Sequence, residues 1–394
     1  MLYHPRLCVK IALVLFFSML IVPSLSLAQT KAYGVKGSLD FIQYWSAFQL
    51  FLHGKNPYDP EAMHALQLAL GQNPEQTIMM WNPPWTLLVL APALIFPFAL
   101  SWKIWFLLSI GFLAGTTFLF HAQCGQKKNS LFHWVGISLL FYPAWECLIW
   151  GQLSLFLTFC FTLVLLGLMN GRDRTAGIFL ALLSIKPHLF YLNALFFIWW
   201  AVQQRRMTFL KSAAVSLLAL SGTCTLLAPH SILDWLQSLR GVAHPTVTPV
   251  QNWKVASLVG FTRECLEIIT GSAPAWPMWV LPLMALSCTV AYLLKRQRTS
   301  DSLSPAFPLL CLSLLTSPYG WLYDQSLLIV PILWSASCSE VRFPMARSRR
   351  KLFSILLFEI FLIAFAIFIA HGQQQFFWVP AVVLLFLAPR LVQI

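Results

Sequence analysis

The feature that most constrains the fold of this chain is a succession of apolar segments long enough to cross a lipid bilayer. A helix needs roughly 17 to 25 mostly apolar residues to cross the hydrocarbon core. Because 58% of the residues are hydrophobic and only 10% are charged, the composition is that of a polytopic membrane protein. We predict an all-α membrane protein whose clearest spans are residues 7–28, 102–121, 131–149, 152–169, 207–228, 276–294, 305–317, 322–338, 352–370 and 376–392.

The distribution of positive charge predicts how these spans are oriented. The net charge of +13 comes from short clusters of Lys and Arg between apolar segments, which argues against one continuous nucleic-acid-binding face. Clusters of this kind mark cytoplasmic loops. On this assignment 18 of the 26 Lys and Arg residues lie inside and 8 outside, although the two longest loops, residues 29–101 and 229–275, are outside.

Glycine and proline mark turns between the spans. Two spans, residues 131–149 and 152–169, are joined at Trp150-Gly151-Gln152, a turn predicted to face outside. Residues 175–201 separate two basic clusters and are divided into two short helices at Lys186-Pro187-His188, since proline cannot continue helical hydrogen bonding.

Residues 83–121 contain two apolar runs. They connect an outer loop to the cytoplasmic cluster Lys127/Lys128, so this part of the chain crosses the membrane once. We predict that residues 84–100 form a helix that lies at the outer surface or dips into the bilayer, and that residues 102–121 cross it. With residues 175–201 counted as two, the total is about twelve spans with both termini in the cytoplasm.

The chain shows no internal repeat and is predicted to form one integral membrane domain. Its first 28 residues are either a retained first span or a signal peptide with a cleavage site at Ser26-Leu27-Ala28. The predicted organisation is a first span at 7–28, an outer loop with surface helices at 29–101, spans within 102–228, a second outer loop at 229–275 and spans within 276–394.

Asp40 is the most distinctive acidic residue, because it follows the first predicted span and begins an aromatic-rich helical segment. Two roles remain open for it. Aspartate is favoured as a helix N-cap, and a carboxylate held at the membrane surface also suits acid/base catalysis. Asp59 and Glu61, in contrast, are predicted to be turn and capping residues.

Several cations of the outer face are candidates for binding an anionic group. Lys186 and His188, at the helix break, suit an anionic headgroup, although a lysine that extends to the interface is an equal alternative. Arg240, Lys254 and Arg263 in the second outer loop are further phosphate-binding candidates or a solvated surface.

Other polar positions leave similar alternatives. Tyr323 and Asp324 follow an outer turn and either line a polar cavity or cap a helix. Tryptophans 81 and 85 flank Asn82 and are more typical of interface anchors than of sugar-stacking residues. Glu359 lies inside a predicted span and is assigned to helix packing.

The sequence has no Walker loop, dinucleotide fingerprint, nucleophile elbow or metal-binding His pair. Its nine Cys residues are scattered, so no disulfide framework or zinc site is predicted. We therefore predict acid/base chemistry at the outer face on a substrate that arrives through the lipid, with no metal and no cofactor.

A set of short motifs, taken in order, resembles glycosyltransferase family 87 of the GT-C superfamily over roughly residues 35–335. The motifs are Asp40-Phe41 with Tyr44 and Ala47, Gly54-Lys55-Asn56-Pro57-Tyr58, Asn82-Pro83-Pro84, Ala91-Pro92, Gly151-Gln152, Ala176-Gly177 through Lys186-Pro187-His188, and Ser317-Pro318.

The resemblance implies a GT-C-like bundle of membrane helices that transfers a hexose from a polyprenyl-phosphate donor to a glycan or glycolipid acceptor. Mannose is the first candidate for this hexose. The reaction is expected to invert the anomeric carbon at the periplasmic face of the inner membrane. Asp40 then acts as general base. The donor phosphate is assigned to Lys186, His188, Arg240, Lys254 and Arg263, and the substrate cavity to Tyr44, Asn82, Gln152, Tyr323 and Asp324.

One departure from the family pattern concerns the second polar partner. Family members often carry a His soon after the outer Ser-Pro turn, where this chain has Tyr323-Asp324. Two other functions stay open at this point: a transporter or flippase for lipid-linked saccharides, which would depend on Glu359, and a polymerase or ligase acting on lipid-linked glycans.

Overall fold

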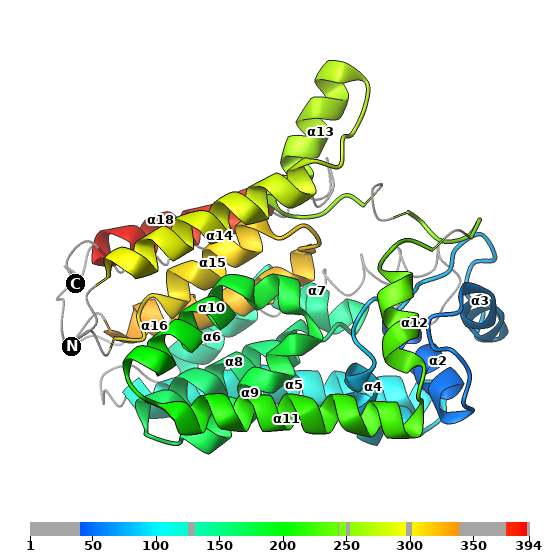
Figure 1. Cartoon of the computed structure of the whole chain (residues 1–394), viewed down its shortest axis with the longest axis horizontal. Helices are drawn as coiled ribbons and strands as arrows, with labels where there is room; N and C mark the ends of the chain where they lie inside the picture. The colour runs from blue at the N-terminus through cyan, green and yellow to red at the C-terminus, as the bar shows by residue number, and fades with distance from the viewer. Residues whose placement is uncertain are drawn as a thin grey trace, which may run out of the picture.

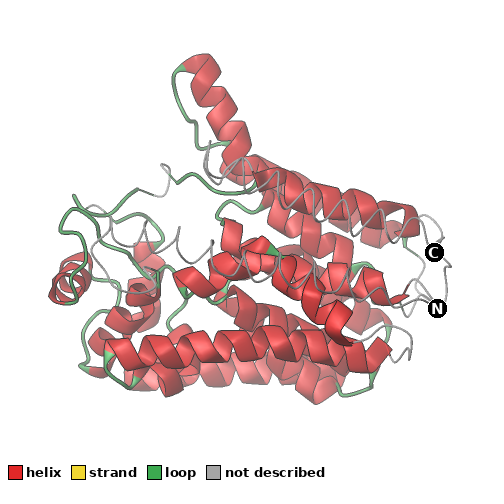
Figure 2. Ribbon diagram, turned by 180° about the vertical axis from the view of Figure 1, so that it is seen from behind, coloured by secondary structure: helices red, strands yellow, loops and turns green. Residues whose placement is uncertain are grey.

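The computed structural model describes residues 40–124, 131–242, 244–249, 253–296, 302–338 and 376–391. Every regular element within these ranges is a helix, which confirms the all-α class for this part of the chain (Figures 1 and 2). The predicted first span at 7–28, its alternative as a signal peptide, and the span 352–370 with Glu359 lie outside the described residues.

The described part of the segment predicted as the first outer loop contains three helices before α5 (Phe98–Cys124). These are α2 (Phe41–Leu52), α3 (Pro60–Ala69) and α4 (Trp85–Leu94). Helix α2 buries Phe41, whose ring lies 6.2 Å from that of Phe98 and 6.4 Å from that of Trp105. Asp59 accepts hydrogen bonds from the backbone amides that follow it and so caps α3, as predicted.

The boundary predicted between the surface helix and the next span is wrong. Helix α4 ends at Leu94, and α5 (Phe98–Cys124) begins directly after Pro97, so residues 98–100 belong to the long helix. Pro97 has no N–H with which to continue α4. The carbonyl of Phe96 in the resulting bend accepts from Trp45 Nε1 at 2.9 Å and from Ser101 Oγ at 2.8 Å.

The predicted span 131–149 is not one continuous helix. It is divided into α6 (Leu131–Leu140) and α7 (Tyr142–Trp150) at Phe141, whose backbone is extended. Pro143 interrupts the hydrogen bonding there, and the carbonyl of Leu139 accepts instead from Trp145 Nε1 at 2.7 Å. The turn predicted after α7 is confirmed, because Gly151 adopts a left-handed conformation with φ of +63°.

The break predicted at Lys186-Pro187-His188 is also confirmed. It follows α8 (Ser154–Met169), α9 (Asp173–Leu182) and the short 3₁₀ helix η1 (Leu183–Ile185), and α10 (Pro187–Gln203) starts at the proline. Helix α11 (Met207–Leu227) then packs on α9 at Gly177, where a Cβ atom would lie 2.5 Å from the carbonyl oxygen of Phe209. Only glycine permits this close approach of the two backbones.

The remaining described residues supply two helices of the second outer segment and five that return to the bundle. They are α12 (Ser231–Ser238), α13 (Leu258–Thr270), α14 (Pro277–Lys295), α15 (Ala306–Thr316), the 3₁₀ helix η3 (Leu322–Leu328), α16 (Ile329–Cys338) and α18 (Trp378–Leu391). The predicted span 322–338 therefore begins with a 3₁₀ segment. Helix α13 projects away from the bundle (Figure 1).

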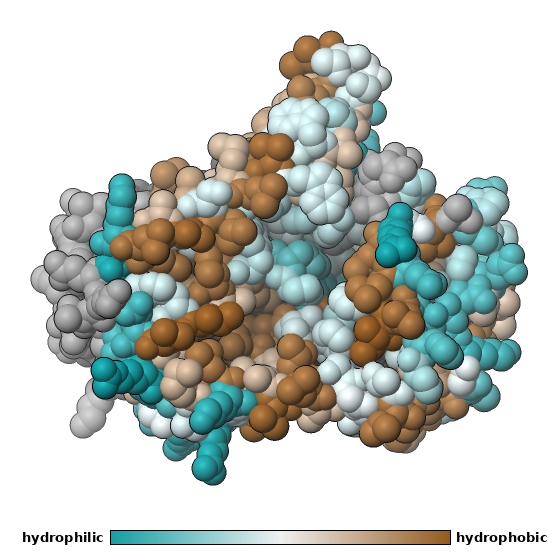
Figure 3. Space-filling view, in the orientation of Figure 1, coloured by the Kyte–Doolittle hydropathy of each residue, from teal (hydrophilic) through white to brown (hydrophobic). Residues whose placement is uncertain are grey.

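Among the described helices, α5, α11 and α14 are long and apolar enough to cross a membrane. Large apolar side chains on them are exposed, with Leu226 86% and Leu218 70% accessible on α11 and Leu283 59% accessible on α14. Figure 3 shows hydrophobic residues gathered over this face between hydrophilic ends. Such a surface is suited to lipid contact. The count of about twelve spans stays a prediction.

The ends of the long helices agree with the orientation predicted from charge. Helix α11 begins just after Arg205 and Arg206, and α14 ends at Lys295. In Figure 1 these ends lie on one side of the molecule, whereas α2, α3 and α12 lie on the other. The described basic residues at the start of α11 and the end of α14 thus lie at the opposite end of the bundle from α2, α3 and α12.

Candidate functional site

Asp40 lies at the start of α2, but its carboxylate makes no hydrogen bond with the first turn of that helix. Its Oδ2 atom accepts instead from Nε2 of Gln152, at 2.7 Å. Asp59, at the same position of α3, does cap its helix. Of the two roles that the sequence left open for Asp40, the cap lacks its defining hydrogen bond, and the carboxylate faces the turn between α7 and α8.

Gln152 connects Asp40 to the other polar groups of the site. Its side chain is buried, and its Oε1 atom accepts from the hydroxyl of Tyr44 at 2.9 Å and from Nζ of Lys186 at 3.1 Å. The left-handed Gly151 makes this possible, because it reverses the chain directly after α7. Of the predicted cavity residues, Gln152 thereby bonds the predicted base, and Tyr44 bonds Gln152.

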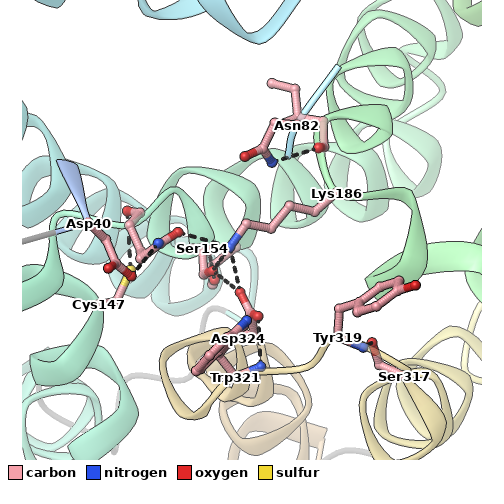
Figure 4. Close-up of polar contacts among 12 residues, drawn as sticks. Asp40, Asn82, Cys147, Ser154, Lys186, Ser317, Tyr319, Trp321 and Asp324 are labelled. Atoms are coloured by element: carbon pink, nitrogen blue, oxygen red, sulfur yellow. Dashed lines mark hydrogen bonds and ion pairs between the residues drawn. The ribbon is translucent and has the colours of Figure 1, made fainter. Parts of the chain in front are cut away.

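Lys186 extends from the break before α10 and forms a buried ion pair with Asp324. Nζ of Lys186 lies 2.8 Å from Oδ1 of Asp324, and both side chains are almost inaccessible to solvent. Figure 4 shows how these side chains converge with Ser154 near Asp40. Ser154 donates to the same Oδ1 at 2.5 Å and lies 3.4 Å from Nζ of Lys186. The opposite charges of the pair and its further hydrogen bonds offset the cost of removing both side chains from water.

Asp324 makes a capping contact and also bonds a polar side chain of the site. Its Oδ2 atom accepts from the backbone amide of Trp321 at 3.0 Å, a helix-capping contact at the start of η3. Its other oxygen binds Lys186 inside the site. The adjacent Tyr323 places its ring 4.9 Å from Nζ of Lys186, within the range of a cation–π contact.

The electrostatic surroundings of Asp40 favour a base that titrates near neutrality. Burial raises the pKa of Asp40 from its ordinary value of 3.8 to about 6. The hydrogen bond from Gln152, the charge of Lys186 and a hydrogen bond from Tyr323 act to lower this pKa, and the charge of Asp324 raises it. The loss of hydration outweighs the favourable contacts.

The first outer segment holds the helix break in place. Asn82 donates from Nδ2 to the backbone carbonyl of Ile185 at 3.0 Å, and the hydroxyl of Tyr58 donates to the carbonyl of Asn82 at 2.7 Å. Trp85 donates to Ser184 Oγ at 3.0 Å. The predicted cavity residue Asn82 thus lies next to Lys186. Its side-chain amide bonds the backbone of Ile185, which precedes this lysine.

An aromatic cluster lies beside the ion pair. The ring of Trp253 lies 5.5 Å from that of Trp81, 5.8 Å from Tyr319 and 5.7 Å from Trp321. His188, a predicted phosphate ligand, places its ring 5.8 Å from Tyr319. These rings are only partly buried. They give the site a partly open aromatic side.

The other predicted phosphate ligands occupy different positions. Arg240 and Lys254 are exposed, one just after α12 and the other next to Trp253. Arg263 is buried, and its guanidinium donates to the carbonyls of Pro274 at 3.0 Å and Ala273 at 3.5 Å, which holds the loop between α13 and α14. Of the predicted phosphate ligands, Lys186 is the one whose side chain forms hydrogen bonds with the other site residues, Gln152 and Asp324.

Ser154 was not among the residues predicted for the site. It donates to Asp324 and contacts Lys186 because it lies two residues after Gln152, at the first turn of α8. Its position two residues after the predicted cavity residue Gln152 is the signal that could have identified it. Within the described ranges, no three His, Cys, Asp or Glu side chains come together in a group able to hold a metal ion.

Comparison with known proteins gives one match. The model of glycosyltransferase family 87 matches residues 81–318, which is more than half of the chain. The matched range contains Asn82, Gln152 and Lys186, whereas Asp40 and Asp324 lie outside it. No curated protein and no solved structure matches the chain.

Proposed function

The chain belongs to glycosyltransferase family 87, and we propose that this membrane glycosyltransferase moves a hexose from a polyprenyl-phosphate donor to a glycan or glycolipid acceptor. Mannose is the first candidate for the hexose. The observation that carries the proposal is the Asp40 carboxylate, which a neutral amide holds in place beside a buried lysine. The basic residues at the start of α11 and the end of α14 lie at the opposite end of the bundle from α2, which supports a site at the periplasmic face of the inner membrane.

The proposed reaction is a single displacement with inversion. The acceptor hydroxyl oxygen attacks the anomeric carbon of the sugar, and its proton passes to the ionised carboxylate of Asp40. The bond between the anomeric carbon and the phosphate oxygen breaks, and polyprenyl phosphate leaves with the electron pair. A positioned general base of this kind accelerates a reaction by about a hundred- to ten-thousandfold.

Lys186 is the first candidate for stabilising the departing phosphate. Charge develops on the leaving oxygen, and a fixed cation stabilises it without a change of protonation. The longest of the three polar contacts of Lys186 is the 3.4 Å approach to Ser154, and we propose that the phosphate replaces this one. His188 lies next in the chain, and Arg240, Lys254 and Arg263 follow it as weaker candidates.

The direct test supplies purified protein with radiolabelled polyprenyl-phosphate mannose and a membrane extract as the source of acceptor. Label transferred to an extract component is the expected result. Parallel reactions with polyprenyl-phosphate arabinose and with nucleotide-linked mannose separate the sugar from the carrier. Transfer from the nucleotide-linked sugar but not from a polyprenyl-linked one would overturn the proposed donor class.

The pKa of Asp40 predicts the pH dependence of transfer. Because the base acts in its ionised form, kcat/KM is expected to fall as pH decreases through about 6, and to be roughly tenfold lower one pH unit below that midpoint. The group cannot cause unfolding in this window, since a carboxyl whose pKa is raised by folding stabilises the protein more at lower pH. Initial rates between pH 5 and 9, with thermal stability recorded at each pH, provide the measurement. A flat profile would contradict the assignment.

A further inference from the structure

The orientation of the Gln152 amide is fixed by the chemistry of its neighbours. The ammonium group of Lys186 can only donate hydrogen bonds, so the end of the amide that faces it at 3.1 Å must be the oxygen. The hydroxyl of Tyr44 donates to the same oxygen at 2.9 Å. The amide nitrogen is consequently left to face Asp40, to which it donates at 2.7 Å.

This arrangement separates the carboxylate of Asp40 from the cation. A carboxylate paired directly with a lysine binds protons weakly, and its lone pairs are occupied by the ammonium group. In this structure Asp324 neutralises Lys186, and Asp40 receives a neutral donor on one oxygen.

We infer that Gln152 is a positioning residue for the transfer reaction, which orients the Asp40 carboxylate through a donor whose direction Lys186 and Tyr44 impose. The inference rests on the proposed role of Asp40 as general base. Gln152 stabilises the ionised carboxylate through a neutral donor at Oδ2, so Asp40 remains basic enough to take the proton of the acceptor hydroxyl. The chain of contacts also couples the base to the cation, because Lys186 is one of the two donors that orient the amide.

Within the described residues, the charged and titratable groups around Asp40 come from several elements. They are Tyr44 on α2, Glu146 and Cys147 on α7, Lys186 before α10, and Tyr323 and Asp324 on η3. Replacing Gln152 leaves all of them in the chain, so a change in the pH profile would report the lost amide donor.

The test is the pH dependence of kcat/KM for a Gln152→Met variant, which keeps an unbranched side chain and removes the donor. We expect the acid limb to move to higher pH by about one unit, so that activity is lowered most near pH 6 and recovers toward pH 9. If Gln152 served structure alone, activity would fall by one factor at every pH. That outcome would overturn the inference.

A second variant and a matched control complete the experiment. Gln152→Glu keeps the shape, and its added negative charge should also move the acid limb upward, which keeps the inference testable if Gln152→Met does not fold. Gln67 is a buried glutamine that bonds both the carbonyl and the amide of Ile78, so Gln67→Met should change stability without moving the limb. An unshifted limb in both Gln152 variants, with Asp40→Asn inactive, would overturn this inference alone, whereas an active Asp40→Asn would overturn the proposed base.

Discussion

Replacement of Asp40 by Asn is expected to lower kcat for sugar transfer by about a hundred- to ten-thousandfold. Asparagine has nearly the same shape, and its amide oxygen can still accept the hydrogen bond from Gln152 that the structure shows at 2.7 Å. The fold and the binding of donor should therefore survive, and only proton transfer should be lost. Rates of label transfer, together with equilibrium binding of the polyprenyl-phosphate sugar, separate these effects.

The chain offers a matched control for that experiment. Asp59→Asn makes the same chemical change at the start of the next helix, where the carboxylate caps α3, and asparagine caps helices about as well as aspartate. Its activity should remain within about twofold of wild type, because caps of these two types differ little in stability. Equal transfer by wild type and Asp40→Asn would refute the assignment of Asp40 as base.

The second large effect is expected at the buried ion pair. Either Lys186→Met or Asp324→Asn leaves one partner uncompensated in a site where both side chains are almost inaccessible. Breaking a buried pair in this way costs about 3 to 5 kcal/mol of stability. Both single variants should lower the thermal unfolding temperature in detergent, and the double variant should recover much of the loss, because it leaves no isolated charge.

Activity distinguishes the two roles of this pair. The double variant should remain inactive despite its recovered stability, since Lys186 is proposed to stabilise the leaving phosphate. The control is Asp173→Asn, which breaks the more accessible ion pair of Asp173 with Arg206 at the end predicted to be cytoplasmic and should destabilise less. A double variant with wild-type activity would show that the pair serves stability alone.

Features with a local cause were predicted well from the sequence. The break at Pro187 and the turn at Gly151 follow from single residues whose backbone chemistry allows little else. The apolar run 131–149 predicts one span and hides the division at Phe141, which Pro143 marks. The boundary at Pro97 differs from the prediction because residues 84–100 read as one surface helix.

The site was predicted as a list of residues but not as a network. Asp40 and Gln152 are 112 positions apart, and Lys186 and Asp324 are 138 apart, so no local pattern pairs them. Two alternatives remained open: cap or base for Asp40, and cap or cavity residue for Asp324. The choice depends on which neighbouring group donates a hydrogen bond to each carboxylate. Only the tertiary arrangement supplies that neighbour, and it also brings Ser154 into contact with the ion pair.

The separation of Lys186 from Asp324 bears on how the protein is made. Synthesis proceeds from the N-terminus, so the lysine is inserted well before its carboxylate partner leaves the ribosome. A lysine without its partner at the bilayer centre costs about 2.5 to 3.5 kcal/mol. Helices α9 and α10 are therefore expected to stay shallow, with Lys186 near the outer surface, until η3 is synthesised. A nascent chain that stops before residue 324 would contain most of the predicted spans and lack the carboxylate partner of Lys186 in the candidate site.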